Sequence, residues 1–275
     1  MRIVALAVMV SLAAPGAAWG GDLGRAKDAV HGDDKKDDDD EKHEHRHDHD
    51  DHDRDHDDDS SDEATGLWLL VIGSPFWVPH LALGDDFAVT HGYGVYPYQG
   101  GGRGLARLTG DDRLPAAGYV GFTGGWRPDD LRTAKVDAQL FTAARVGLAT
   151  TWYHFVEPQP QGPADTLTVG DVEVTFRFAE SERVSFWTGL GGRVLPDAHL
   201  DLGFDFAYGV DLFPVDPITV SLRADVGSLG HARVLGASGR IGVLLGPVDV
   251  GVGGDVLAIG SSTLTAITAG IRLWL

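Results

Sequence analysis

The residues best suited to chemistry form a histidine-rich run near the N-terminus. Four of its histidines alternate beside carboxylates and two more follow at wider spacing: His43, His45, His47 and His49, then His52 and His56. In an extended chain, alternate side chains share one side, so several imidazoles can converge on one ion. Neutral imidazole suits Zn, Ni and Cu. We therefore predict a divalent-metal site here. The alternative is a solvated acidic spacer whose histidines bind nothing in the cell.

The run lies inside an acidic segment that we predict to be a disordered tail, residues 21–63. From Asp22 to Glu63 it carries 20 acidic and 7 basic side chains, and residues 31–62 include no bulky apolar side chain. Such a chain buries too little apolar surface to offset the entropy lost on ordering.

Catalytic candidates elsewhere are few. His154 precedes Glu157 by three positions, Ser228 and His231 share one connection, and His199 follows Asp197. No nucleophile elbow, phosphate loop, dinucleotide fingerprint or zincin motif is present. We therefore predict no enzyme activity and no bound cofactor. The alternative is a lipid-modifying hydrolase that uses His154 or His231.

The N-terminus has the features of an export signal. Arg2 precedes the apolar run Ile3–Ala14, and Pro15 and the small residues Gly16, Ala17 and Ala18 follow. This predicts a signal peptide over residues 1–20, cleaved between Ala18 and Gly21. The run is too short for a membrane helix of about 20 residues. The chain has no cysteine, which excludes disulfides and thiolate metal sites, and its net charge of −19 argues against a nucleic-acid partner.

The element that must position these groups is a β-sheet. Two runs around the turn at 213–217 alternate apolar and polar residues over His199–Leu212 and Ile218–Gly227. This period of two is typical of strands with one apolar and one polar face. Similar runs predict an all-β fold with strands at Ala116–Trp126, Arg132–Leu140, Arg145–Val156, Thr166–Phe178, Arg183–Val194, His199–Leu212, Ile218–Gly227, Ala232–Leu245, Val248–Ala258 and Thr263–Leu275.

Each of these runs is close to, or a little longer than, the roughly 9–11 residues that a membrane strand needs. We predict an antiparallel up-and-down transmembrane barrel of eight or ten strands over residues 116–275. Short connections alternate with a set that includes the long Glu157–Asp165 connection, as in outer-membrane barrels. A soluble exported β-domain carrying a metal-buffering tail is the alternative, because alternation alone does not exclude it.

The polar face favours the membrane barrel. It combines small residues with single charges, as in Asp201-x-Gly203-x-Asp205, and this suits a narrow lumen. We expect Phe204, Phe206 and Tyr208 to face lipid, and a lumen filled by ion pairs between neighbouring strands. The charged side chains expected to point inward are Lys135, Asp137, Asp171, Glu173, Arg177, Arg193, Arg223, Asp225, Arg240 and Arg272.

The last strand carries a resemblance. Thr268, Gly270, Leu273 and Leu275 resemble the C-terminal insertion signal of bacterial outer-membrane β-barrel proteins, although an aromatic residue is usual where Leu275 stands. The resemblance implies insertion into the outer membrane of a Gram-negative bacterium. Its implied partners are the membrane lipids and the insertion machinery, and the tail would then lie in the periplasm.

Residues 64–115 are rich in aromatic residues and glycine, and we interpret them as an irregular, ordinarily packed segment. The alternative is an interfacial or lumen-plugging segment, since Trp and Tyr favour membrane boundaries. The sequence as a whole predicts a non-enzymatic outer-membrane barrel with a structural, adhesive or small-solute role.

Overall fold

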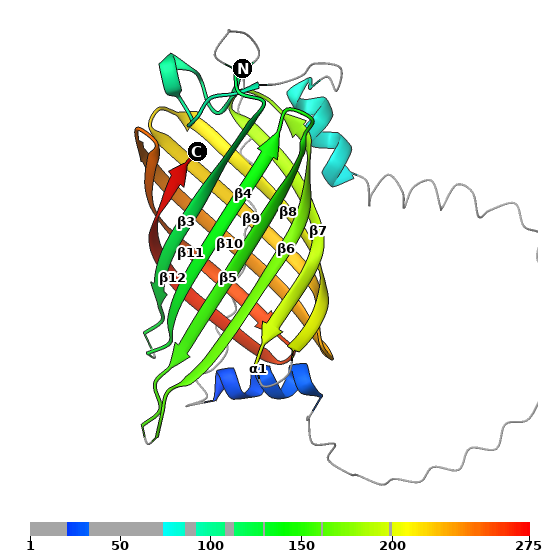
Figure 1. Cartoon of the computed structure of the whole chain (residues 1–275), viewed down its shortest axis with the longest axis vertical. Coiled ribbons are helices and arrows are strands. Elements are labelled where there is room, and N and C mark those ends of the chain that lie inside the picture. Colours follow the sequence, from blue (N-terminus) through cyan, green and yellow to red (C-terminus); the bar gives the residue numbers. More distant parts are fainter. Residues whose placement is uncertain are drawn as a thin grey trace, which may run out of the picture.

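The computed structural model shows one closed barrel with a helix across one mouth and a short irregular segment in the other (Figure 1). It describes residues 21–32, 74–85, 92–107, 113–128, 130–160, 162–197 and 200–275. The barrel strands are β3 (Ala116–Trp126), β4 (Arg132–Thr142), β5 (Val146–Glu157), β6 (Asp165–Glu180), β7 (Val184–Pro196), β8 (Leu200–Val215), β9 (Ile218–Leu229), β10 (Ala232–Leu245), β11 (Val248–Ile259) and β12 (Ser262–Trp274).

Each strand pairs antiparallel with its neighbours in sequence, and β12 closes the ring on β3. Thr123 of β3 lies opposite Gly270 of β12. The barrel therefore has ten strands, and the eight-stranded alternative is wrong. All ten predicted strands are confirmed, because sustained alternation marks a strand whichever partners it finds.

Alternate side chains divide the barrel into two surfaces. Along β8, the side chains of Leu202 and Phe204 lie on the outside and are 63% and 51% exposed. The side chain of Asp205 lies in the interior and is 0% exposed. The outer wall is thus apolar and the interior polar, the reverse of a water-soluble barrel. Among the described residues, no helix is long and apolar enough to cross a membrane.

The two ends of the barrel differ. The chain end Leu275 exchanges backbone hydrogen bonds with Gly118, so the first and last barrel strands meet at one end. The connections at that end are short, and the longer connection between Glu157 and Asp165 lies at the other end (Figure 1). This arrangement agrees with the predicted alternation of connections.

A helix, α1 (Asp22–His31), lies across the mouth farther from Leu275 (Figure 1). We predicted disorder over residues 21–63, and this is wrong for α1. Its apolar residues Leu23, Ala26 and Val30 recur at helical spacing and are 0% exposed. Gly32 then ends the helix with φ of 79° and donates its N–H to the Asp28 carbonyl. The disorder prediction failed because the barrel supplies the apolar surface that an isolated segment lacks.

The opposite mouth is filled by residues 92–107, which we call the loop cap. It contains β1 (Gly92–Tyr93), the short 3₁₀ helix η1 (Gln99–Gly101) and β2 (Ala106–Arg107). Tyr93 is 0% exposed, and Gly104 packs so closely that a Cβ there would lie 1.7 Å from the Glu182 carbonyl oxygen. The lumen-plugging alternative for this part of residues 64–115 is therefore the better description.

A helix at 74–83 lies beside the barrel near the same mouth (Figure 1). Its Phe76 ring packs edge-on against Phe178, and Tyr208 donates a hydrogen bond to the Pro75 carbonyl. Trp77 of the same helix remains 43% exposed. The aromatic residues of this segment thus divide between an outer helix and the loop cap.

Candidate functional site: the barrel interior

The interior has three layers. Beneath α1, apolar side chains from most strands form one cluster that includes Phe155, Leu167 and Leu229. At the opposite mouth, Phe141, Phe213 and Trp274 form a second cluster with the loop cap. Charged side chains fill the space between. Two apolar layers therefore separate a charged middle layer from water at both ends.

The centre of the charged layer is Arg223 of β9. Its Nη2 lies 2.8 Å from Glu173 Oε1 and 3.1 Å from Asp171 Oδ2, both on β6, and 3.5 Å from Asp205 Oδ2 on β8. Its Nη1 donates to Thr151 Oγ1 at 2.8 Å. This guanidinium therefore links β9 to strands three and four positions away around the ring, β6 and β5.

Asp171, Glu173 and Asp205 offer three carboxylate oxygens within 4.8 Å of one another, the spacing of a cation site. All three residues are buried, so their charges need a partner. The Arg223 guanidinium already lies among them. The cluster is therefore an internal ion-pair site, in which a side-chain cation stands where a metal ion would bind.

Further pairs surround this centre. Arg193 Nη2 lies 2.7 Å from Asp205 Oδ1, Lys135 Nζ 2.7 Å from Asp255 Oδ1, and Arg240 Nη1 3.1 Å from Asp249 Oδ1. Every charged side chain predicted to point inward does so and has an ion-pair partner. We expected pairs between neighbouring strands. Several instead cross the lumen, because long Arg and Lys side chains reach past the next strand in so narrow a barrel.

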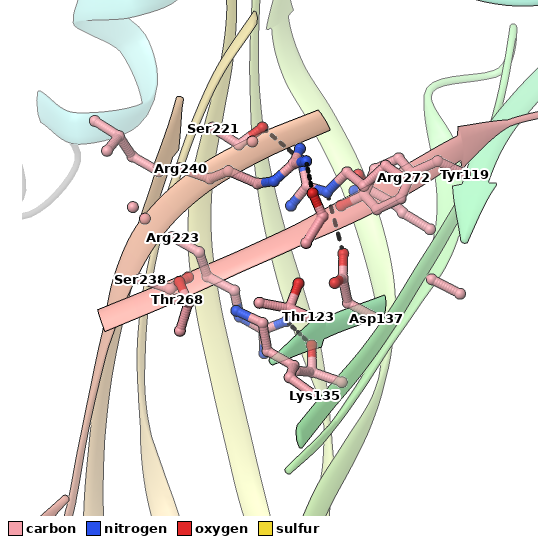
Figure 2. Close-up of a pocket in the computed structure, with 18 of the residues that line it drawn as sticks. Tyr119, Thr123, Lys135, Asp137, Ser221, Arg223, Ser238, Arg240, Thr268 and Arg272 are labelled. Carbon is pink, nitrogen blue, oxygen red and sulfur yellow. Dashed lines mark hydrogen bonds and ion pairs between the residues drawn. The ribbon is translucent and has the colours of Figure 1, made fainter. Parts of the chain in front are cut away.

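The remaining space is small (Figure 2). The larger cavity has a volume of about 50 Å³ and the second about 10 Å³. A buried water needs roughly 10–15 Å³ measured in this way. Figure 2 shows Arg240 and Arg272 side by side over the larger cavity, with Arg272 directed at Asp137 and Ser221. These two cavities together have room for a few waters.

The outer wall decides the class of protein. Large apolar side chains on every strand are about half exposed, among them Phe122, Leu148, Leu190 and Val252. Monomeric soluble proteins do not expose so continuous an apolar surface. The chain is an outer-membrane-type β-barrel. A water-soluble β-domain does not account for this wall.

No family model and no curated protein matches the chain. Solved structures that resemble it include "KdgM porin", with 6% sequence identity and a TM-score of 0.33. The match covers 56% of this chain and 98% of that chain. A second, "KdgM porin in complex with disordered oligogalacturonate", has the same coverage and identity and a TM-score of 0.26.

The catalytic candidates do not assemble among the described residues. His154 lies on the outer face of β5 and contacts Thr168 Oγ1, whereas Glu157 on the same strand points into the barrel. Ser228 accepts a hydrogen bond from the Phe204 N–H, and His231 lies in the following turn. His199 and the six tail histidines lie outside the described residues. The metal prediction therefore stays a prediction.

The four residues of the C-terminal signal lie on two different surfaces of the barrel, the interior and the outer wall. Thr268 and Gly270 line the interior, while Leu273 and Leu275 are 44% and 59% exposed on the outer wall. Trp274 turns inward and packs on Tyr119, with ring centroids 5.2 Å apart. The aromatic residue at this end thus belongs to the apolar layer of the mouth, which accounts for its displaced position. Recognition by the insertion machinery stays a prediction.

Helix α1 is the element of the barrel mouth that was not predicted from the sequence. Helix α1 contacts all five connections at its mouth. Asp22 pairs with Arg127, Lys27 with Asp165 and Asp197, and the His231 N–H donates to the Val30 carbonyl. A Cβ on Gly260 would lie 2.6 Å from that of Ala29, so the helix also rests on the last connection. The spacing of Leu23, Ala26 and Val30 was the available signal.

An ionisable side chain holds each mouth closed: Asp22 in α1 and Tyr98 in the loop cap. Burial raises the pKa of Asp22, but hydrogen bonds from Arg127 and Arg25 outweigh it and the pKa is lowered overall. The interactions of ionised Asp22 therefore stabilise the docked position of α1 above pH 3.8, and this stabilisation is lost as the pH falls further.

In the loop cap, burial raises the pKa of Tyr98 to about 12, and its hydroxyl donates to the Ile218 carbonyl at 2.6 Å. The neutral phenol therefore holds this cap until strongly alkaline pH.

Proposed function

We propose that this protein is a non-enzymatic outer-membrane barrel with a closed lumen, whose role is structural or limited to the passage of water-sized solutes. The observation that supports this most directly is the charged middle layer between two apolar layers, with only about 50 Å³ of space in its larger cavity. A sugar or peptide does not fit that space. The absence of an assembled nucleophile and base among the described residues favours the non-enzymatic role.

The middle layer itself supports a closed state. Cross-lumen pairs such as Arg223 with Glu173 occupy the axis of the barrel, so seating or release of α1 leaves the obstruction in place. Breaking such a pair leaves an uncompensated buried charge, which costs about 3–5 kcal/mol. Thermal opening of the layer is therefore rare.

The purified protein in planar bilayers tests this proposal. We expect no unitary conductance steps and no swelling of vesicles in sugar solutions, with an open general porin as the positive control. Replacing Leu23 and Val30 by Asp should unseat α1 and still leave the bilayer silent, because the charged layer persists. Frequent large steps from the unaltered barrel would contradict the closed lumen.

We also propose that the tail binds divalent metal and that it lies in the periplasm. The loop cap follows the tail in the sequence and packs against Trp274 at the same mouth as Leu275. With Leu275 in the periplasm, this supports a periplasmic position for the C-terminal part of the tail. Calorimetric titration with Zn²⁺ near neutral pH should give binding that disappears when the six tail histidines are replaced by Ala. Below pH of about 6.5 the imidazoles become charged, and binding should weaken. An unchanged isotherm in the Ala variant would refute the site.

A further inference from the structure

Glu157 at the end of β5 is a buried carboxylate, with 8% of its surface exposed. At the same mouth, Lys27 pairs with Asp165 and Asp197, and Arg127 pairs with Asp22. The Glu157 oxygens accept two backbone N–H groups from the start of α1. Gly21 N lies 3.3 Å from Oε1, and Leu23 N lies 3.3 Å from Oε2.

Burial of a carboxylate is costly unless a positive charge lies close to it. A peptide N–H carries only a partial charge, and the dipole of a ten-residue helix adds a fraction of one. A free α-amino group at Gly21 would carry a full positive charge at neutral pH, because its usual pKa is about 7.7–8.0. The same nitrogen atom would then form an ion pair with Glu157.

The sequence before Gly21 fits such a terminus. Ala18 and Gly20 are small residues at the third and first positions before the Gly20–Gly21 bond, the pattern that signal peptidases cleave. Hydrolysis of that bond adds the hydroxyl of water to the Gly20 carbonyl carbon and a proton to the Gly21 nitrogen. A second proton from solvent completes the ammonium. Gly21 has φ of 104°, and nothing lies within 4 Å of a Cβ built on it.

We propose that the mature chain begins at Gly21 and that Glu157 is the receptor for its α-ammonium. Removal of the signal peptide then supplies the charge that seats α1 in the mouth of the barrel. Docking of α1 therefore depends on export, because the ammonium group exists only after the signal peptide has been removed. This dependence does not require that the lumen conducts solutes.

Two measurements test the proposal. The mass and N-terminal sequence of protein isolated from the outer membrane should show a chain that starts at Gly21; any other start overturns it. Next, refolded full barrels that start at Gly21 or at Trp19 are compared by the rate of trypsin cleavage after Arg25 and Lys27 in α1. We expect cleavage about tenfold faster with the Trp19 start, which corresponds to the loss of one charged hydrogen bond.

The variant Glu157→Gln separates the ion pair from a steric effect of the extension. In this variant the two starts should be cleaved at the same rate, within about twofold. A tenfold difference that persists in Glu157→Gln would refute the ammonium site. Glu182→Gln, the same change at the opposite mouth, is the matched control and should keep the full difference. The heat-dependent gel shift of each variant verifies that the barrel has folded.

Discussion

Replacing Arg223 by Ala is expected to lower the free energy of unfolding by about 3–5 kcal/mol, the cost of breaking a buried ion pair on one side. The substitution removes the cation that lies within 3.5 Å of Asp171, Glu173 and Asp205 and leaves three carboxylates facing one another. Urea unfolding of the refolded barrel, followed by the gel shift between folded and unfolded forms, measures the loss.

Controls distinguish the ion-pair centre from a general effect of removing arginine. Arg103→Ala removes a side chain that is 72% exposed, and it should change the stability by less than about 0.5 kcal/mol. Arg223→Lys keeps the charge but cannot reach three carboxylates in one plane, so an intermediate loss is expected. Equal stability of Arg223→Ala and the unaltered barrel would show that the central layer is hydrated and open.

Replacing Leu190 by Arg is expected to cost about 2–4 kcal/mol in a lipid bilayer, the penalty for a cation near the membrane midplane. Leu190 stands near the middle of β7 and is 56% exposed on the outer wall. The loss is measured by urea titration in vesicles, where tryptophan emission reports unfolding.

The matched control is Leu200→Arg. Leu200 is similarly exposed, at 65%, but it stands at the first position of β8, near the membrane boundary. Its cost should fall to about 0–1 kcal/mol, because the penalty depends on depth. Equal costs at the two positions would mean that the apolar wall does not span a bilayer.

The fold could be predicted from the sequence because successive residues of a barrel strand face lipid and lumen in turn, and their side chains differ accordingly. Alternation in Leu202, Phe204 and their neighbours identifies one apolar face, and the small residues with single charges on the other face indicate a narrow interior. A guanidinium group that faces lipid is costly. The side chains of Arg223, Arg240 and Arg272 are therefore expected to point into the lumen. Ion pairing was predictable for the same reason, since a buried charge without a partner is costly.

The partners in those pairs were decided only by the closed structure. Arg223 and Glu173 are 50 residues apart and lie on strands that are not neighbours, so no local pattern records their contact. The choice between eight and ten strands also required closure. It depends on whether β3, whose four glycines weaken its pattern, pairs with β12.

By itself, the sequence determined a barrel with an apolar outer wall and a charged, filled interior, because these properties follow from the pattern of each strand. The tertiary structure alone decided that both mouths are closed. Helix α1 is too short to be stable in water without a partner, and its apolar residues have meaning only beside the cluster that they cover. The spacing of Leu23, Ala26 and Val30 indicates a helix with one apolar face. It does not record which distant residues cover that face, because those contacts join segments far apart in the chain.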